Sequence, residues 1–334
     1  MAASPHLGLG LDSYSAGPAI ARLEETVAGL LGKEAGLWFP KGVTAQQAAL
    51  KVHAAASGRT TVAIHPKSHI ALEEAGALER LAGLTAVRVG TDQRPFIAAQ
   101  LGAVAEPLAA VVLELPLRRA AFQAPSWDSL VAVSDWARGR GVAFHLDGAR
   151  IWETQPYYDR PLADIAGLAD SVYVSLYKGL GGLGGCVLAG PAELIEQAKP
   201  WRIRYGGDLP SSFPMIITAL DGLATTLPKM GGYHRHAVEL AAAIDAAPGL
   251  RAFPNPPHCN AFQVHFGASA KALQAAALAE AEASGTWLFN AFDQGLLPDT
   301  ASGELGVGEA TMDWTIDEIV ATLTRLLERA AAEG

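Results

Sequence analysis

The hydrophobic positions of this chain form short, nearly continuous runs that are separated by longer amphipathic stretches. Runs of this length without polar alternation are typical of strands that are buried on both faces of a sheet. Amphipathic segments such as residues 126–141 lie between several of the runs and have helical spacing. Strands that alternate with helices predict a mainly parallel sheet with helices on both faces. The six predicted strands are residues 61–66, 85–90, 109–116, 141–147, 171–177 and 185–190.

Two helices are predicted near the start of the chain. The first covers residues 18–31, because Pro18 suits the first helical position and Gly32 follows the last apolar residue. The second is the Ala-rich segment 45–56. Residues 41–44 are expected to form a loop that leads into this second helix.

The pattern changes after about residue 210 and predicts a second, smaller unit. Residues 210–227 have a mainly helical pattern, and residues 257–285 have the pattern of a strand followed by a helix. A final helix is expected from about Thr315 to Glu333. We therefore predict an α/β fold with a large domain over residues 1–225 and a smaller α+β domain over residues 226–334.

Composition and charge exclude several classes of protein. Half of the 334 residues are hydrophobic and 18% are charged, as in a well-packed enzyme. The net charge of -9 disfavours binding to nucleic acid, and we expect no membrane partner because long apolar stretches and a signal-peptide pattern are lacking. Cys186 and Cys259 are too few for a disulfide framework or a structural metal site. We expect a cytoplasmic protein without a metal.

Three polar residues follow the buried runs where the carboxyl ends of parallel strands meet. Asp147 and Lys178 each come at the end of a predicted strand, 31 residues apart, and Arg150 lies three residues after Asp147. A buried carboxylate needs a partner, which the protonated ring nitrogen of pyridoxal 5'-phosphate (PLP) supplies. A desolvated lysine has a lowered pKa, which suits its condensation with an aldehyde. These groups predict a PLP site with Lys178 as the Schiff-base lysine.

Two further segments fit the same site. The loop of residues 41–44 precedes a helix N-terminus, where free N–H groups and the helix dipole favour a phosphate group. His69 follows the predicted strand at residues 61–66 and is positioned to lie against a cofactor ring or to transfer a proton.

The motifs HLDGAR, SLYKGLGGLGG and LEETVAGLLGKEAGLWFPKGVTAQQAAL resemble the L-threonine aldolase/β-eliminating lyase family of PLP enzymes, over residues 12–207. The resemblance implies the aspartate-aminotransferase-like fold (fold type I) and a homodimer or homotetramer with active sites at subunit interfaces. It also implies that Tyr14 lies close enough to reach a neighbour's cofactor. By position, the resemblance assigns the cofactor to Lys178, Asp147, Arg150, His69, Gly42, Val43 and Thr44.

The chain departs from the family at positions that bind the substrate. The family's Ser-Gly-Thr-Met loop is Lys-Gly-Val-Thr here, and Leu117 stands where a histidine often reaches the substrate's β-hydroxyl group. Pro210 replaces an arginine, and a C-terminal arginine that binds the substrate carboxylate has no counterpart. We therefore expect Arg150, Arg202 or Arg204 to orient the substrate.

These observations predict a lyase that cleaves a β-hydroxy-α-amino acid to glycine and an aldehyde. Lys178 and His69 are the predicted catalytic residues, with His69 or a bound water as the base. Two alternatives stay open. One is a PLP-dependent β-eliminating lyase acting on another β-substituted amino acid, and the other is a PLP-fold binding protein with reduced activity.

Other motifs carry weaker hypotheses. The glycines at 179, 181 and 184 match the dinucleotide-binding pattern, but residues 185–190 are predicted as a strand where that pattern needs a helix. The pairs His234/His236 and His258/Cys259 lack a suitably spaced third metal ligand. His65 and His145 are predicted to be structural.

Overall fold

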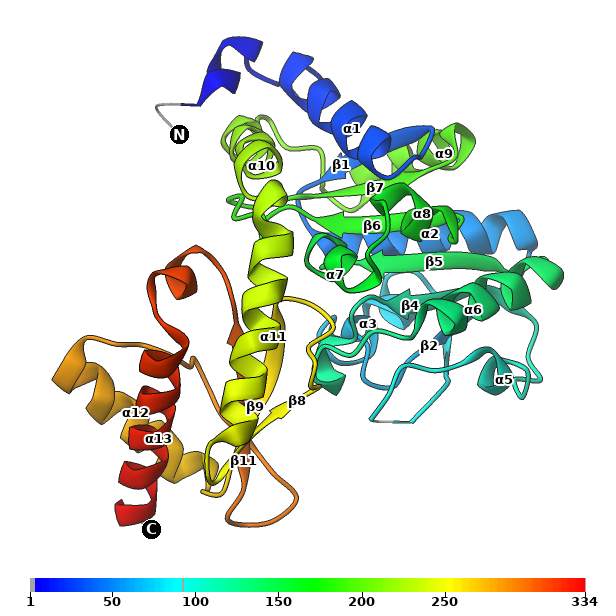
Figure 1. Cartoon of the computed structure of the whole chain (residues 1–334). Helices are drawn as coiled ribbons and strands as arrows, with labels where there is room; N and C mark the ends of the chain where they lie inside the picture. The colour runs from blue at the N-terminus through cyan, green and yellow to red at the C-terminus, as the bar shows by residue number, and fades with distance from the viewer. Residues whose placement is uncertain (1–3, 92, 334) are drawn as a thin grey trace. The chain divides into compact units, whose positions relative to one another are not determined.

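The computed structural model describes residues 4–91 and 93–333. The chain divides into two compact units, Met1–Lys229 and Met230–Gly334 (Figure 1). The first unit contains the strands β1 (Ala35–Phe39), β2 (Thr61–Ile64), β3 (Thr85–Arg88), β4 (Leu108–Glu114), β5 (Ala143–Gly148), β6 (Ser171–Ser175) and β7 (Cys186–Gly190). Its helices are η1 (Pro5–Leu9), α1 (Pro18–Leu30), α2 (Gly42–Ser57), α3 (His69–Leu72), α4 (Ala77–Arg80), α5 (Ala98–Leu101), η2 (Arg118–Ala120), α6 (Trp127–Gly139), α7 (Ile151–Tyr158), α8 (Leu162–Gly167), α9 (Ala192–Arg204), α10 (Phe213–Thr225) and η3 (Leu227–Lys229).

The strands of the first unit form one sheet of seven, in the order β1-β7-β6-β5-β4-β2-β3. The strands from β6 to β3 in this order pair in parallel, while β7 is antiparallel to both β6 and β1. The predicted α/β fold with a mainly parallel sheet is therefore confirmed. Because β7 turns back beside β6, the glycine-rich segment between them leads into a strand, as the sequence predicted.

Helices cover both faces of the sheet, since every strand pair would otherwise expose apolar side chains. Figure 1 shows α6, α7 and α8 in front of the sheet and α2 behind it. Helix α2 packs with α9 over β1, β6 and β7, and one buried cluster joins them: Leu37, Phe39, Ala45, Ala48, Ala49, Val52, Tyr173, Cys186, Leu188, Leu194, Ile195 and Ala198. Alanine dominates the contact face of α2, so this helix lies close to the strands.

Four parallel strands end at the same edge of the sheet. Strands β2, β4, β5 and β6 run in one direction, so their carboxyl ends lie side by side. Glu114 and Asp147 are directly opposite each other in the pairing of β4 with β5. Lys178 follows the end of β6 by three residues. The edge therefore gathers polar side chains from segments that are far apart in the sequence.

The expected loop at residues 41–44 is largely helical, which corrects the prediction. Helix α2 begins at Gly42, and Lys41 is its N-cap residue. The low helix propensity of Gly42 and Val43 made this turn look like a loop in the sequence.

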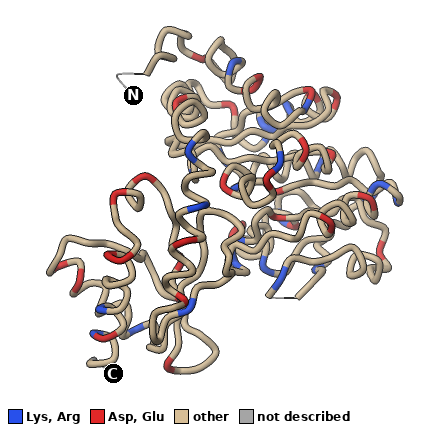
Figure 2. The backbone as a smooth tube through the Cα atoms, viewed as in Figure 1, with Lys and Arg blue, Asp and Glu red and all other residues tan. Residues whose placement is uncertain are grey.

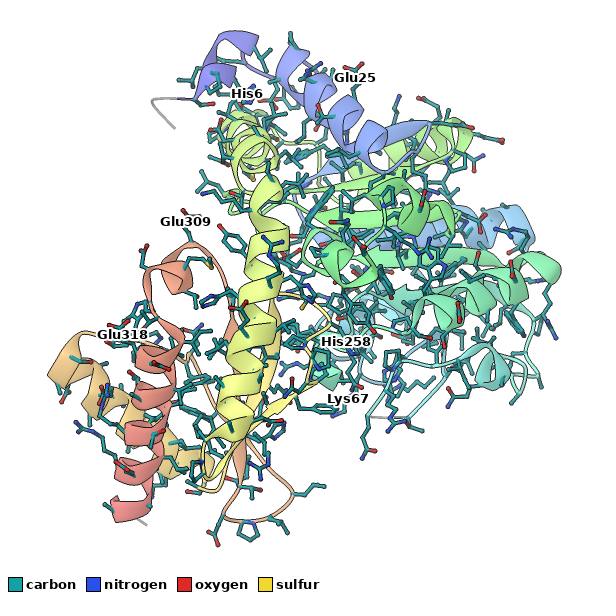
Figure 3. All side chains as sticks on the ribbon, in the orientation of Figure 1. His6, Glu25, Lys67, His258, Glu309 and Glu318 are labelled. Carbon is teal, nitrogen blue, oxygen red and sulfur yellow. The ribbon has the colours of Figure 1, made fainter. Side chains whose placement is uncertain are left out.

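The N-terminal segment lies beside helix α10 of the same unit. The Ser4 hydroxyl donates a hydrogen bond of 2.7 Å to the Asp221 carboxylate, and the His6 ring is 4.0 Å from the same group. Figure 3 shows His6 on this segment and Glu25 on α1. The contacts hold η1 against α10.

The second unit is built on an antiparallel sheet in the order β10-β11-β9-β8. Its last helix begins as predicted, because the Thr315 N–H and hydroxyl both donate to Glu318, which Figure 3 labels. Figure 2 shows acidic and basic residues distributed along both units. The elements are α11 (Met230–Ala246), β8 (Leu250–Phe253), β9 (Ala261–Phe266), α12 (Ala270–Ser284), β10 (Asp293–Gln294), β11 (Ala301–Gly306), η4 (Glu309–Asp313) and α13 (Ile316–Glu333).

Across the described residues, none of the helices combines the length and the apolar character that crossing a membrane requires.

Candidate active site

A cavity lies at the carboxyl edge of the large sheet. The empty space between its lining residues, together with the solvent at its mouth, is about 310 Å³. The structure brings Lys178, Asp147, His69, Gly42 and Val43 together around it, as the sequence predicted for one site. The full set of lining residues is Lys41, Gly42, Val43, Gln46, His69, Glu74, Asp147, Ala149, Tyr173, Tyr177 and Lys178.

Asp147 is buried at the floor of this cavity and is held by two donors. The Gln46 side-chain amide donates to Oδ2 at 2.5 Å, and the Ala149 N–H donates to Oδ1 at 3.2 Å. Burial raises the pKa of Asp147, while the nearby Lys178 and His69 act in the opposite direction. The donors therefore support the ionised carboxylate against the cost of desolvation.

Lys178 lies in surroundings that favour its neutral form. Burial is the main cause that lowers the pKa of Lys178, and the guanidinium group of Arg150 lowers it further. The carboxyl groups of Asp147, Glu114 and Glu153 raise it and oppose the shift. Lowering the pKa of a lysine increases the fraction that is neutral, and the neutral amine is the form that attacks a carbonyl carbon.

Glu153 fixes the turn that follows Lys178. Its Oε1 accepts a hydrogen bond of 2.9 Å from the Gly179 N–H. A Cβ atom at Gly179 would lie 2.4 Å from this carboxyl group, so only glycine fits there without a shift. Burial raises the pKa of Glu153, and Arg150 opposes it.

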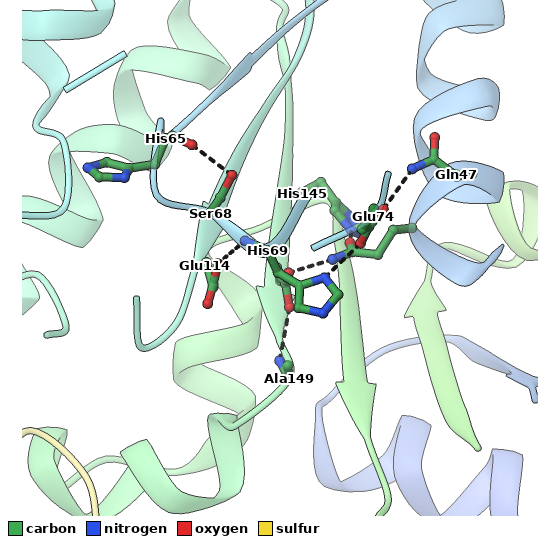
Figure 4. Close-up of polar contacts among 10 residues, drawn as sticks. Gln47, His65, Ser68, His69, Glu74, Glu114, His145 and Ala149 are labelled. Atoms are coloured by element: carbon green, nitrogen blue, oxygen red, sulfur yellow. Dashed lines mark hydrogen bonds and ion pairs between the residues drawn. The ribbon is translucent and has the colours of Figure 1, made fainter. Parts of the chain in front are cut away.

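His69 is oriented by two carboxyl groups, as Figure 4 shows. Its Nδ1 is 3.0 Å from Oε1 of Glu74, and its backbone N–H donates to Oε2 of Glu114 at 2.6 Å. The hydrogen bond to Glu74 raises the pKa of His69, and burial opposes this effect. Glu74 is held in turn by the Gln47 amide at 3.0 Å. An imidazole that a carboxylate orients in this way is the arrangement of a general base.

Glu114 connects two segments at the edge of the cavity. It accepts hydrogen bonds from the N–H groups of His69 and Arg118, at 2.6 Å and 3.2 Å. Burial raises the pKa of Glu114 to about 7, with Asp147 contributing in the same direction. Glu114 therefore holds α3 and the segment after β4 together.

The N-terminus of α2 forms one wall of the cavity. A Cβ atom at Gly42 would lie 2.2 Å from the Tyr173 hydroxyl, so the missing side chain is what allows this close packing. The Thr44 hydroxyl donates to the Lys41 carbonyl at 2.7 Å and turns back toward its own helix. Thr44 is thus outside the described lining of the cavity, while Lys41 belongs to it.

Three of the predicted substrate-binding residues lie elsewhere in the described structure. The Arg202 guanidinium donates to the Trp38 carbonyl at 3.2 Å, and Arg204 stacks 4.5 Å above the ring of Trp201. Tyr14 is 63% exposed. Arg202 and Arg204 are outside the lining of this cavity and contact α9 and its neighbours, so their role with a substrate stays a prediction.

Arg150 directly follows Ala149, which lines the cavity. It is the N-cap residue of α7, and its guanidinium carbon is 5.5 Å from the ring centre of Phe122. Its positive charge lowers the pKa values of both Lys178 and Glu153. Among the three predicted arginines, Arg150 is the one whose charge acts on the site.

Several residues of the site were not predicted from the sequence. Gln46 lies in an Ala-rich helix, where a buried amide is unusual, and this was a signal that could have been noticed. Tyr173 lies on the same face of β6 as Ser171 and Ser175, and three hydroxyl groups on one face of a buried strand were a second signal of a polar site. Nothing in the sequence indicated a role for Glu74, because it lies outside the helices and strands. In the described part of the chain, His, Cys, Asp and Glu residues form no group of three suited to a metal.

Comparisons with known proteins agree with this site. Low-specificity L-threonine aldolase 1 of Arabidopsis thaliana is 30% identical over 244 residues, which are 70% of this chain and 68% of that enzyme. A Listeria monocytogenes protein provisionally described as an L-allo-threonine aldolase has 33% identity and a TM-score of 0.91, over 97% of this chain and 90% of its own.

A second solved structure is equally similar. It comes from Exiguobacterium sp. 255-15 and is provisionally described as an aromatic amino acid beta-eliminating lyase/threonine aldolase. Its identity is 34% and its TM-score 0.91, over 98% of this chain and 92% of its own. The model of the beta-eliminating lyase family matches residues 1–268, which include the whole cavity. The chain therefore belongs to the beta-eliminating lyase family, and it is a lyase.

Proposed function

We propose that this chain is a PLP-dependent lyase that cleaves a β-hydroxy-α-amino acid to glycine and an aldehyde. One observation carries the proposal. Lys178, whose pKa is lowered, and the buried Asp147 line the same cavity as the N-terminus of α2. The names of the relatives, which are threonine aldolases, support this choice of substrate class.

The residues present fit the cofactor. The Lys178 amine suits its aldehyde carbon, and the Asp147 carboxylate suits its ring nitrogen. The N–H groups at the start of α2 and the Lys41 ammonium suit a phosphate dianion. When bound, PLP supplies an electron sink for the bonding electrons released at Cα.

The chain's own residues then handle protons and charge. His69 takes the proton of the substrate's β-hydroxyl group, and Glu74 stabilises the imidazolium that results. Leu117, which stands where the family often has a histidine, is buried and carries no proton acceptor, so His69 or a bound water performs this step. Arg150 orients the substrate carboxylate.

Assembly and location complete the proposal. The enzyme forms a homodimer or homotetramer in which the segment carrying Tyr14 approaches a neighbouring cavity. Leu11 and Tyr14 are 73% and 63% exposed, as expected for apolar side chains that a second subunit covers. The enzyme acts in the cytoplasm, in keeping with its two buried cysteines, Cys186 and Cys259, which are not joined in a disulfide.

The test is reduction of the purified protein with borohydride in the presence of PLP, followed by peptide mapping. We expect the reduced cofactor on Lys178 and no label in the variant Lys178→Ala. A label on Lys41 or on another lysine would refute the proposal. Product analysis with L-threonine and phenylserine should yield glycine and an aldehyde. A keto acid with ammonia would instead show β-elimination.

A further inference from the structure

A chain of four hydrogen bonds runs from Asp147 away from the cavity through the interior of the large unit. The Gln46 amide nitrogen contacts Asp147 Oδ2 at 2.5 Å, and the Gln46 amide oxygen contacts His145 Nε2 at 2.6 Å. The other His145 nitrogen, Nδ1, contacts the Ser171 hydroxyl at 2.7 Å. The same hydroxyl contacts His53 Nε2 at 2.7 Å.

The regular structure places these five side chains in line. Gln46 and His53 are two turns apart on α2, so they lie on the same face of that helix. His145 and Asp147 are two residues apart on β5 and point to one side of the sheet. Ser171 is the register partner of His145 on β6. All five are buried.

The ionised carboxylate of Asp147 determines which atom donates in each bond of this hydrogen-bond chain. An ionised Asp147 accepts only, so the Gln46 NH2 group faces it and the Gln46 oxygen must accept from His145 Nε2–H. Burial lowers the pKa of His145 to about 3, so this ring is neutral and its Nδ1 is an acceptor. The Ser171 hydroxyl therefore donates to His145 and accepts from His53 Nε2–H. Every donor in this hydrogen-bond chain therefore points toward Asp147.

We infer that this hydrogen-bond chain, extending to Ser171 and His53, keeps Asp147 ionised and so keeps the proton on the ring nitrogen of bound PLP. The inference rests on the proposed function. Hydrogen bonds to a carboxylate make it a weaker base, and a weaker base leaves the shared proton on the pyridine nitrogen. Gln46, His145, Ser171 and His53 are positioning residues, since none of them is required to touch the reacting atoms.

Ser171 has an effect at a distance because its hydroxyl donates to Nδ1 of His145 and so stabilises the tautomer that carries its proton on Nε2. Without the Ser171 donor, this tautomer loses one of its two hydrogen bonds, and the Gln46 NH2 group is held less firmly against Asp147. The weaker donor leaves the carboxylate more basic. A serine outside the cavity thus acts on Asp147 through His145 and Gln46.

The test compares PLP with an analogue that has carbon in place of the ring nitrogen. Equilibrium titration should show that Ser171→Ala weakens PLP binding about three- to tenfold, and Gln46→Met more than about tenfold, given the usual strength of such hydrogen bonds. Binding of the analogue should change less than about twofold, because it has no proton to share. The nitrogen-15 NMR shift of labelled PLP should move from the pyridinium toward the neutral pyridine position in both variants.

The matched control is Ser134→Ala. Ser134 is also buried, and its hydroxyl donates to the Leu168 carbonyl at 2.5 Å. Neither residue belongs to the hydrogen-bond chain that ends at Asp147. This variant should bind both ligands as the wild type does and leave the nitrogen shift unchanged. An equal loss for PLP and the analogue in Ser171→Ala and Gln46→Met, or an unmoved nitrogen shift, would overturn the inference. Failure of the wild type to bind PLP at Lys178 would instead refute the proposed function, and the inference with it.

Discussion

Substitution of Gly179 by alanine tests how the turn after Lys178 is held. The new methyl group would lie 2.4 Å from the Glu153 carboxyl carbon and from its Oε1 atom. Glu153 is fully buried, so its carboxyl group must move within a packed interior to make room. The movement breaks the hydrogen bond of 2.9 Å from the Gly179 N–H to Glu153.

The magnitude follows from these two changes. Overpacking of an interior typically costs about 1–3 kcal/mol, and a lost hydrogen bond to a carboxyl group about 1.5–3 kcal/mol. We therefore expect Gly179→Ala to lower the free energy of unfolding by about 3–5 kcal/mol. Glu153→Ala removes the obstacle and should cost about 2–4 kcal/mol, for the lost bond and the cavity. The double variant should be about as stable as Glu153→Ala alone, because the alanine methyl enters the space that the carboxyl group leaves.

Urea denaturation of the four proteins, followed by circular dichroism without added cofactor, measures the coupling between the two positions. We expect the double variant to be more stable than the sum of the single effects by about 3–5 kcal/mol, the full cost of Gly179→Ala. Additive effects would refute the reasoning, since they would show that Gly179 is required for a reason other than the Glu153 carboxyl group. Retained PLP binding in Gly179→Ala would also contradict the view that this turn positions Lys178.

Three further outcomes are expected. Burial lowers the pKa of His53 to about 4 from its ordinary value of 6.5, so His53 by itself should cost the folded protein about 3 kcal/mol of stability as the pH falls from 6.5 to 4. Urea titrations across this range should show a smaller loss in His53→Gln, and an equal loss would contradict the assignment. Glu74→Gln removes the main cause that raises the pKa of His69, so the acidic limb of the pH–rate profile should move to lower pH. Lys41→Met should weaken PLP binding about five- to tenfold but leave the binding of pyridoxal, which lacks the phosphate, unchanged in a fluorescence titration.

The sequence was sufficient to predict Asp147 and Lys178 because both rely on one geometric rule. Parallel strands place their carboxyl ends at a common edge, and each residue directly follows a recognisable buried run. His69 was found for the same reason, since it comes soon after β2. When a residue directly follows a parallel strand, its place in the sequence pattern also predicts its place at the edge of the sheet.

Other parts of the site depend on contacts between segments that the pattern does not relate. Gln46 reaches Asp147 across 101 residues, and Glu114 reaches the His69 N–H across 45. The contacts of Arg202 and Arg204 could not be predicted for the same reason. Their charge suggested a role with an anionic substrate, but the end of α9 offers Arg202 a backbone carbonyl and gives Arg204 an aromatic ring. Residue type alone did not distinguish these partners from a ligand.

The carboxyl groups near Lys178 differ in their donors, and this difference assigns their roles. The carboxyl oxygens of Glu114 and Glu153 accept from backbone N–H groups, at 2.6 Å and 3.2 Å for Glu114 and at 2.9 Å for Glu153. Burial raises the pKa of both, as it does for Asp147, and their backbone donors show that they hold backbone segments. Asp147 also accepts from a side-chain amide, whose orientation the buried histidine chain fixes. A side-chain donor of fixed orientation supports one protonation state, and for this reason Asp147 is the carboxylate suited to pair with a charged ring nitrogen.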